Sequence, residues 1–339
     1  MSLWRYIFRR ILSTLPTIFG ALVIMFILTR ILPGDPVLMI LGPAHASPEN
    51  IEKLRQVMGL DHSIPVQFAR YLGQLFKGDL GFSWHSGNPV SQELMARFPA
   101  TFELTTFALV LMIIFGLPLG VMAGHYRNRA PDNIINGVTV MGISMPTFWL
   151  GLLLIYVFFF KLGIAPPPMG RLSSEVGVPN VVTGFMLVDT LLDRNFSSFL
   201  SALQQLILPG VTLAFFNLAI IVRTLKADMI ETLREDFIRT ARAMGVGQKR
   251  ILFKYALRNA LLPTVTMIGT IYGSLLGGAV LTEVVFSWPG LGMYAVESIQ
   301  WLDYAGLQGF IIFYVLIFTL VNLIVDISYR SIDPRVQLD

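Results

Sequence analysis

Residues 235–245 read EDFIRTARAMG, and residues 258–263 read RNALLP. The segment from Arg223 to Arg258 holds 9 of the 25 Lys and Arg residues of the chain, and a long apolar run lies on each side of it. A membrane protein that concentrates positive charge in one internal loop usually keeps that loop on the inner side of the bilayer. This pattern favours a docking element on a transporter over the active site of an enzyme.

The remainder of the chain is unusually apolar: 54% of its 339 residues are hydrophobic and 14% are charged, whereas a soluble domain has about 25% charged residues. Six runs contain no Asp, Glu, Lys or Arg: 11–29, 104–124, 134–160, 195–222, 259–282 and 304–325. A helix of about 20 residues crosses the hydrocarbon core, so each run can span it. In the fourth run the membrane part is expected at about 206–222. We therefore expect an all-α polytopic membrane protein with six transmembrane helices in contact with lipid.

The distribution of positive charge predicts the topology. Four segments expected on the inner side hold 16 Lys and Arg residues together: 1–10, 125–133, 223–258 and 326–339. The outer loop 283–303 holds none, so both chain ends are predicted to be cytoplasmic. This explains the basic composition without a nucleic-acid partner. The first apolar run exceeds the 7–15 residues of a signal-peptide core, so we expect it to be retained as a span.

The expected organisation has three parts: 1–31 as the N-terminal end and first span, 32–101 as a helical outer insert, and 102–339 as a core with five spans. In the insert, Ser47–Pro48 predicts a helix start and Gly59 its end. A second insert helix is expected from about Pro65 to Lys77, before Gly78. The second outer segment, 161–204, is expected to be irregular with one short helix.

Within the inner loop 223–263, residues 228–244 are predicted to form one amphipathic helix. Its apolar stripe comprises Met229, Leu233, Phe237, Ala241 and Met244. Gly245 and Gly247 are expected to end this helix before a second one begins near Gln248. Three interpretations remain open: a helix lying on the bilayer surface, a solvated connection, or a segment that fits a groove on a partner.

Two features inside the spans suggest close packing or a solute path. Glycines recur every fourth residue at Gly116, Gly120 and Gly124, and again at Gly269, Gly273 and Gly277. This spacing allows close helix packing, either within the chain or, for the second set, at a seam with another subunit. Ser144, Thr147 and Trp149 surround Pro146. They could line a solute path, or the hydroxyls could bond back to their own helix.

Several kinds of chemistry are missing from the sequence. The dipeptide Gly-Lys does not occur, so no phosphate-binding loop of the Walker type is present. There is no cysteine and the four histidines are far apart, so neither a metal site nor a catalytic set is predicted. Glu103, Glu283 and Asp326 fall at the ends of spans, where we expect them to reach water. The absence of an acid in mid-membrane argues against an ion-coupled carrier.

The loop resembles the cytoplasmic loop of ABC importer permeases, whose signature reads Glu-Ala-Ala, three residues, Gly, then a distal Leu-Pro. Arg239, Thr240, Ala241 and Gly245 occupy these positions, with Leu262–Pro263 downstream, and the first two depart from the signature. The stretch KYALRNALLP at 254–263 is similar to the dipeptide, oligopeptide and nickel branch. Further matching stretches run from end to end: ILPGDP (31–36), MGLD (58–61), KGDLG (77–81), RFPATFEL (97–104), SMPTFWLG (144–151), TEVVFSWPGLG (282–292) and DPR (333–335).

This resemblance implies a type I ABC importer permease fold in a bacterial inner membrane. The implied partners are a second related permease, two cytoplasmic ATPases that hold ATP and Mg, and a periplasmic solute-binding protein, with no cofactor on this chain. It implies an ATPase-coupling role for six residues: Glu235, Asp236, Arg239, Ala241, Arg242 and Gly245. The insert 32–101 would help to dock the binding protein. The rival is an ion-coupled secondary transporter acting without ATPase partners. The solute is left open among dipeptides, oligopeptides, nickel and glutathione.

Overall fold

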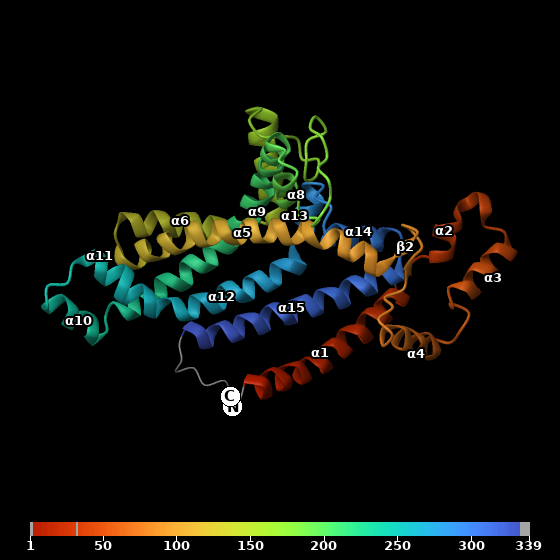
Figure 1. Cartoon of the computed structure of the whole chain (residues 1–339), viewed down its shortest axis with the longest axis horizontal. Helices are drawn as coiled ribbons and strands as arrows, with labels where there is room; N and C mark the ends of the chain where they lie inside the picture. Colours follow the sequence, from red (N-terminus) through yellow and green to blue (C-terminus); the bar gives the residue numbers. More distant parts are fainter. Residues whose placement is uncertain (1–2, 32, 333–339) are drawn as a thin grey trace.

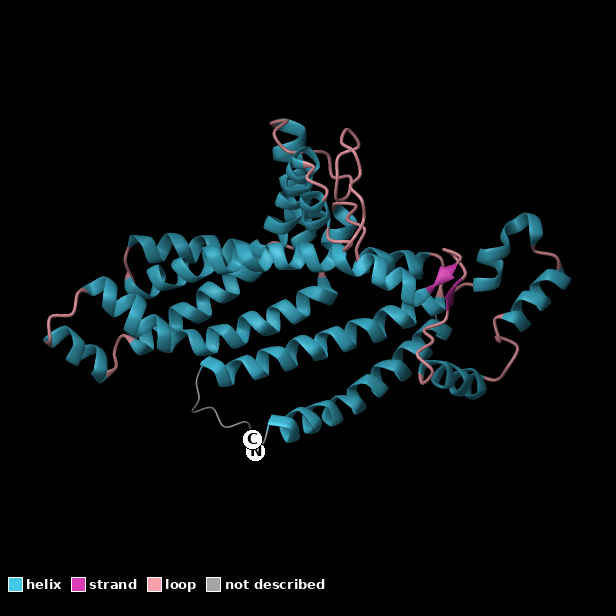
Figure 2. Ribbon diagram, in the orientation of Figure 1, coloured by secondary structure: helices cyan, strands magenta, loops and turns pink. Residues whose placement is uncertain are grey.

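The computed structural model describes residues 3–31 and 33–332 and is almost entirely helical (Figure 1, Figure 2). Five helices are long and apolar enough to cross a membrane. They are α1 (Leu3–Ile31), α5 (Val90–His125), α9 (Phe196–Thr232), α12 (Leu257–Gly278) and α15 (Tyr304–Ile332). A sixth span follows if α6 (Ala130–Ser144) and the segment 147–161 count as one element, although they are bent by 105°. The prediction of six spans is confirmed in this sense.

The bend in the third span separates α6 from α7 (Thr147–Leu154) and its π-helical continuation η1 (Ile155–Lys161). Pro146 stands between them, and its ring fixes φ near −59° and removes a backbone donor. In Figure 1 the α7 segment and the neighbouring α8 (Met186–Leu192) project sideways from the long helices. α9 packs against both α7 and α8 in this projecting part.

Close contact between α5 and α9 forms the centre of the bundle. The predicted glycine face of α5 lies against α9, where a Cβ at Gly120 would come within 2.8 Å of Leu225 and one at Gly124 within 2.6 Å of Met229. Small residues let two helix backbones approach at this distance. The intrachain packing that was predicted for this set is therefore confirmed.

The second glycine face, on α12, is occupied by α15 of the same chain. Gly269 lies against Val325, Gly273 against Phe318 and Gly277 against Tyr314. The prediction that Gly269, Gly273 and Gly277 form a seam with another subunit is therefore contradicted, because α15 packs against all three, with Gly269 and Gly273 buried and Gly277 partly buried. The alternative, packing within the chain, is what the structure shows.

The outer insert contains the expected helices. They are α3 (Pro48–Val57), whose N-cap Ser47 Oγ accepts a hydrogen bond from the Asn50 N–H at 3.3 Å, and α4 (Ile64–Leu75). Before them lies α2 (Pro36–His45), and after them a hairpin of β1 (Phe82–Ser83) and β2 (Asn88–Pro89) that was not predicted. The boundary expected at residue 101 is wrong, since α5 is continuous from Val90 and the insert ends at the hairpin.

The insert is fastened to the end of α1. Arg30 donates from Nε and Nη2 to Gln67 Oε1 at 3.0 and 2.9 Å, and its guanidinium lies 4.4 Å from the centre of the Phe26 ring. Phe26 in turn packs on Phe68 and Tyr71 of α4. Because cation–π and aromatic contacts add to the hydrogen bonds, α4 is held as part of the bundle.

Two further short helices lie in the stretch 283–303 and just before it, where only a loop was expected. They are α13 (Val280–Val285) and α14 (Leu291–Gln300). In the second outer segment the irregular chain with one short helix, α8, agrees with the prediction. The helix α9, however, begins at Phe196. This helix is therefore much longer than the membrane part that was predicted at about 206–222.

Candidate functional site

The loop between α9 and α12 forms a short helix at one end of the bundle (Figure 1). The chain leaves α9 at Thr232, turns, and forms α10 (Asp236–Ala243). It then returns through α11 (Gln248–Arg250) and the π-helical η2 (Ile251–Ala256) into α12. The prediction of one continuous helix over 228–244 is wrong, because the backbone breaks at residues 233–235. Three adjacent charged residues, Arg234 to Asp236, were the signal for a new helix start.

One side of α10 is fixed to the spans. Ile238 is fully buried and Ala241 nearly so, in a cluster with Met229, Ile251 and Ala256. The cluster also contains Val121 of α5 and Ala260 of α12. Ala241, which the resemblance placed among the coupling residues, thus anchors α10 to its own chain and has no surface to offer a partner.

The other side of α10 is open. Phe237 and Met244, assigned to the same apolar stripe as Met229 and Ala241, are 41% and 71% exposed. Ile238 and Ala241, spaced by three residues, face the core, and Phe237 and Met244 lie on the exposed side of the same helix. Two large apolar side chains exposed on a charged helix are unusual for a solvated loop and typical of an interaction surface.

The charged residues around these side chains are also exposed. Glu235, Asp236, Arg239 and Arg242 all lie at the surface. One ion pair joins Arg239 Nη1 and Asp236 Oδ1 at 3.1 Å, with both side chains more than two-thirds exposed. An exposed pair of this kind contributes at most about 1 kcal/mol. Arg239 and Asp236 can therefore give up this contact and bind a partner at little cost in free energy.

Gly245 ends α10 in a Schellman motif. Its φ is +76°, the Val246 N–H donates to the Ala241 carbonyl at 3.1 Å, and the Gly245 N–H donates to the Arg242 carbonyl at 3.0 Å. The left-handed conformation favours glycine because a Cβ would approach the following carbonyl. The sharp turn expected at this position is confirmed.

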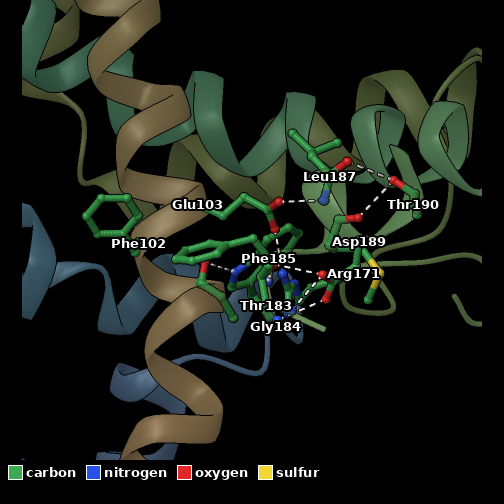
Figure 3. A network of polar contacts seen from close by, with 12 residues as sticks. Phe102, Glu103, Arg171, Thr183, Gly184, Phe185, Leu187, Asp189 and Thr190 are labelled. Atoms are coloured by element: carbon green, nitrogen blue, oxygen red, sulfur yellow. Dashed lines mark hydrogen bonds and ion pairs between the residues drawn. The ribbon is translucent and has the colours of Figure 1, made fainter. Parts of the chain in front are cut away.

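A polar network connects α5 to α8 and to the segment before it (Figure 3). Glu103 accepts from Arg171 Nη2 at 2.6 Å and from the Leu187 N–H at 2.7 Å. Both side chains of this ion pair are about nine-tenths buried. A buried carboxylate needs such partners, and through them Glu103 holds this segment in place. The expectation that Glu103 reaches water is therefore wrong.

Asp189 organises the same segment. One carboxylate oxygen accepts from the Thr183 N–H and hydroxyl at 2.8 and 2.7 Å, and the other from the Gly184 N–H at 2.9 Å. Burial by itself raises the pKa of Asp189, but the hydrogen bonds from Thr183 and Gly184 outweigh it and lower the pKa below its ordinary value. Asp189 is therefore a charged clamp inside the outer segment.

Glu283, also expected to reach water, is completely buried. Its two carboxylate oxygens accept from the Thr101 hydroxyl at 2.7 Å and the Met293 N–H at 2.9 Å. Burial raises the pKa of Glu283 above its ordinary value, and the bond from Thr101 opposes this rise. The glycines at 290 and 292 let the chain approach this carboxylate closely. Asp326 lies in α15, and its side chain is outside the described part of the structure.

The three side chains proposed for a solute path lie at the bend in the third span. Ser144 is the last residue of α6, Thr147 the first of α7, and Trp149 is 46% exposed. The exposed side chains beside them include the apolar Met141 and Phe148. Ser144, Thr147 and Trp149 remain a predicted path lining that the structure does not test.

Comparison with known proteins decides the family. Residues 116–338 match the family described as binding-protein-dependent transport system inner membrane component, and residues 3–105 match its N-terminal part. The chain belongs to this family. It is therefore a multi-pass component of an inner-membrane transport system, and the helix α10 is part of a permease subunit.

Members of this family resemble the chain over its full length. A probable D,D-dipeptide transport system permease, DdpB of Escherichia coli, is 46% identical over 99% of this chain and 98% of its own. The di/tripeptide permease DppB of Pseudomonas aeruginosa is 41% identical, with 98% of each chain covered. The glutathione permease GsiC of Escherichia coli is 39% identical over 98% of both chains.

Proposed function

We propose that this chain is one of two permease subunits of an ATP-driven importer for di- or oligopeptides or a related small solute. The observation that carries this proposal is α10, which is anchored on one side and exposes Phe237 and Met244 on the other. The similarity to dipeptide, di/tripeptide and glutathione permeases supports the solute class. The names of all three relatives refer to the transport of small peptides or of a peptide-like molecule.

The proposed assembly has four kinds of partner. A second, related permease completes the path, two cytoplasmic ATPases bind ATP and Mg, and a periplasmic binding protein delivers the solute. The loop 223–263 and both chain ends lie on the cytoplasmic side. This chain itself contributes no nucleotide site, in agreement with the absence of a Gly-Lys loop.

The mechanism rests on how α10 is attached. Its buried side chains contact α5, α9, η2 and α12 through one apolar cluster. Protein interiors are closely packed and transmit displacement, so a push on α10 moves these helices together. Near this cluster in sequence, Lys226 of α9 pairs with Asp132 of α6 at 2.5 Å. Closure of the ATPases would thus rotate four spans and change which side of the membrane the path faces.

The first test is purification of this chain from its native membrane in mild detergent, with mass spectrometry of the proteins that accompany it. We expect a second permease and ATPases with Walker motifs. Reconstitution with these subunits and the binding protein should give peptide uptake that requires ATP. Recovery of the chain alone, with uptake driven by an ion gradient, would establish the secondary transporter instead.

A further inference from the structure

The outward face of α12 differs from the outward faces of α5 and α15. Between Arg258 and Gly277 the exposed residues are Arg258, Asn259, Pro263, Thr266, Thr270 and Ser274. Within the described residues, no exposed large apolar side chain lies between Phe253 and Leu281. We refer to Asn259, Thr266, Thr270 and Ser274 as the polar face of α12.

The polar face runs along one side of α12, with the exposed Pro263 between Asn259 and Thr266. Its members are spaced by seven, four and four residues, which places them on one side of a helix. From Asn259 to Ser274 the helix rises about 22 Å at 1.5 Å per residue, most of the roughly 30 Å hydrocarbon core. The flanking positions are filled, with Gly273 against Phe318 of α15 and Ile271 and Leu275 in the central core.

Spans that meet lipid look different in this chain. On α15, the neighbour of α12, the exposed side chains include Leu316, Leu320 and Ile324, each at least 50% exposed. On α5 they include Ile114 and Phe115. Apolar side chains are the rule where a helix contacts hydrocarbon. A face of the same length with an amide and three hydroxyls is suited to water.

Hydrogen bonding within the helix does not account for this face. The Thr266 and Thr270 hydroxyls each donate to the carbonyl four residues earlier at 3.1 Å, and Asn259 Nδ2 donates to the Tyr255 carbonyl at 2.8 Å. Such bonds make single polar residues tolerable in lipid. They do not explain why this part of the exposed surface contains no large apolar side chain.

We infer that the polar face of α12 lines the water-filled solute path, where this chain meets the second permease. This inference rests on the proposed function and names the residues that line its solute path. The four side chains are uncharged and can donate or accept hydrogen bonds. They would accommodate the backbone amides of a passing peptide without selecting among its side chains.

The absence of cysteine in this chain permits a direct test. Single variants Thr266→Cys, Thr270→Cys and Ser274→Cys are assembled with cysteine-free partner subunits, purified and placed in lipid nanodiscs, where both sides are accessible. Leu320→Cys on α15 is the control, because the neighbouring Phe318 and Val321 lie at the depth of Gly273. Reaction with a charged methanethiosulfonate is followed by the mass of the intact chain.

The thiols at 266 and 270 should react at least about tenfold faster than the thiol at 320, because the reactive thiolate forms only where water is present. Equally slow reaction at 266, 270 and 320 would overturn the inference and place the face in lipid or in a dry subunit contact. ATP-driven uptake by the cysteine-free parent tests the proposed function separately. Labelling of every variant after denaturation confirms that the thiols are intact.

Discussion

At the scale of single residues, backbone conformation and hydrogen bonding give particular side chains their roles. Gly245 is left-handed at the end of α10, and the two hydrogen bonds of the Schellman motif depend on that conformation. Asp189 receives three hydrogen bonds from two consecutive residues. Each of the two residues determines the conformation of the segment around it.

We expect Gly245→Pro to uncouple transport from ATP hydrolysis while the protein still inserts in the membrane. Proline cannot adopt a positive φ and loses the N–H that donates to Arg242, so α10 would no longer end at a fixed angle. Peptide uptake per ATP hydrolysed should fall at least about tenfold, which corresponds to about 1.4 kcal/mol of lost coupling.

Gly247→Ala is the matched control for this substitution. Gly247 has a φ of −61° and open space around its Cβ position, so alanine should leave uptake unchanged. Normal uptake by the proline variant, with normal amounts of all subunits, would contradict a coupling role for this turn.

We expect Asp189→Asn to loosen residues 171–190. The NH₂ group of the new amide would face the hydrogen-bond donors of Thr183 and Gly184 and could not accept from them. Loss of hydrogen bonds to a charged group costs at least about 1.5 kcal/mol. Hydrogen exchange of this segment should increase in the variant. Asp193→Asn is the control, because Asp193 is exposed and receives one side-chain bond, from Asn180.

The same carboxylate predicts the pH dependence of the outer segment. The pKa of Asp189 is lower in the folded protein than the ordinary value of about 3.9. Its stabilising effect is therefore fully present above pH 4 and is lost as the pH falls through the lowered pKa. Protection of residues 171–190 from hydrogen exchange, measured relative to the intrinsic exchange rate at each pH, should be steady from pH 7 to 5 and fall only under stronger acid. A loss of protection already at pH 6 would contradict this assignment.

At the scale of helices, the contact between α5 and α9 determines how the bundle moves. The glycine face of α5 receives Ile221, Leu225 and Met229 of α9 with no space for a larger residue. The same end of α9 carries the apolar cluster beneath α10. A displacement of α10 is therefore shared by α5 and α9 as one unit.

We expect Gly120→Val to destabilise this pair by about 1–3 kcal/mol, the usual cost of overpacking a close helix contact. The added methyl groups would overlap Leu225, whose side chain lies 2.8 Å from the Cβ position. The double variant Gly120→Val with Leu225→Ala should recover part of the loss. The thermal unfolding midpoint of the purified subunit measures both, and Gly137→Ala, which meets open space, is the control.

At the scale of the whole molecule, the two ends of the bundle present different segments of the chain. One end presents α10, and the other presents the insert of α2 to α4 (Figure 1). Neither α3 nor α4 contains a buried residue, so the insert offers most of its surface to the outside. The long helices between them connect these surfaces directly.

We expect replacement of residues 48–77 by a short glycine–serine linker to abolish capture of the loaded binding protein. Binding of the ATPases should persist, because α10 and its apolar base lie at the other end of the bundle. Co-purification of each partner with the variant measures the two effects. If the binding protein is still captured with unchanged affinity, the insert is a structural cap only.

The number of spans, the helices of the insert and the inner loop could be predicted from the sequence because they depend on local signals. Apolar runs of about 20 residues suffice to identify spans, and Ser47, Gly59 and Gly78 mark helix ends by their own conformational preferences. The full-length motifs also identified the importer family. The predicted coupling residues Glu235, Asp236, Arg239 and Arg242 lie on the exposed loop as expected.

The tertiary structure decided what each residue contacts, because burial depends on chain segments distant in sequence. Packing against the spans buried Ile238 and Ala241 and left Phe237 and Met244 of the same helix exposed, and α15 packed against the glycines of α12. Glu103 and Glu283 can be buried because Arg171 and Thr101 donate hydrogen bonds to their carboxylates. The polar face of α12 emerged in the same way, since only packing shows which side of a helix remains exposed.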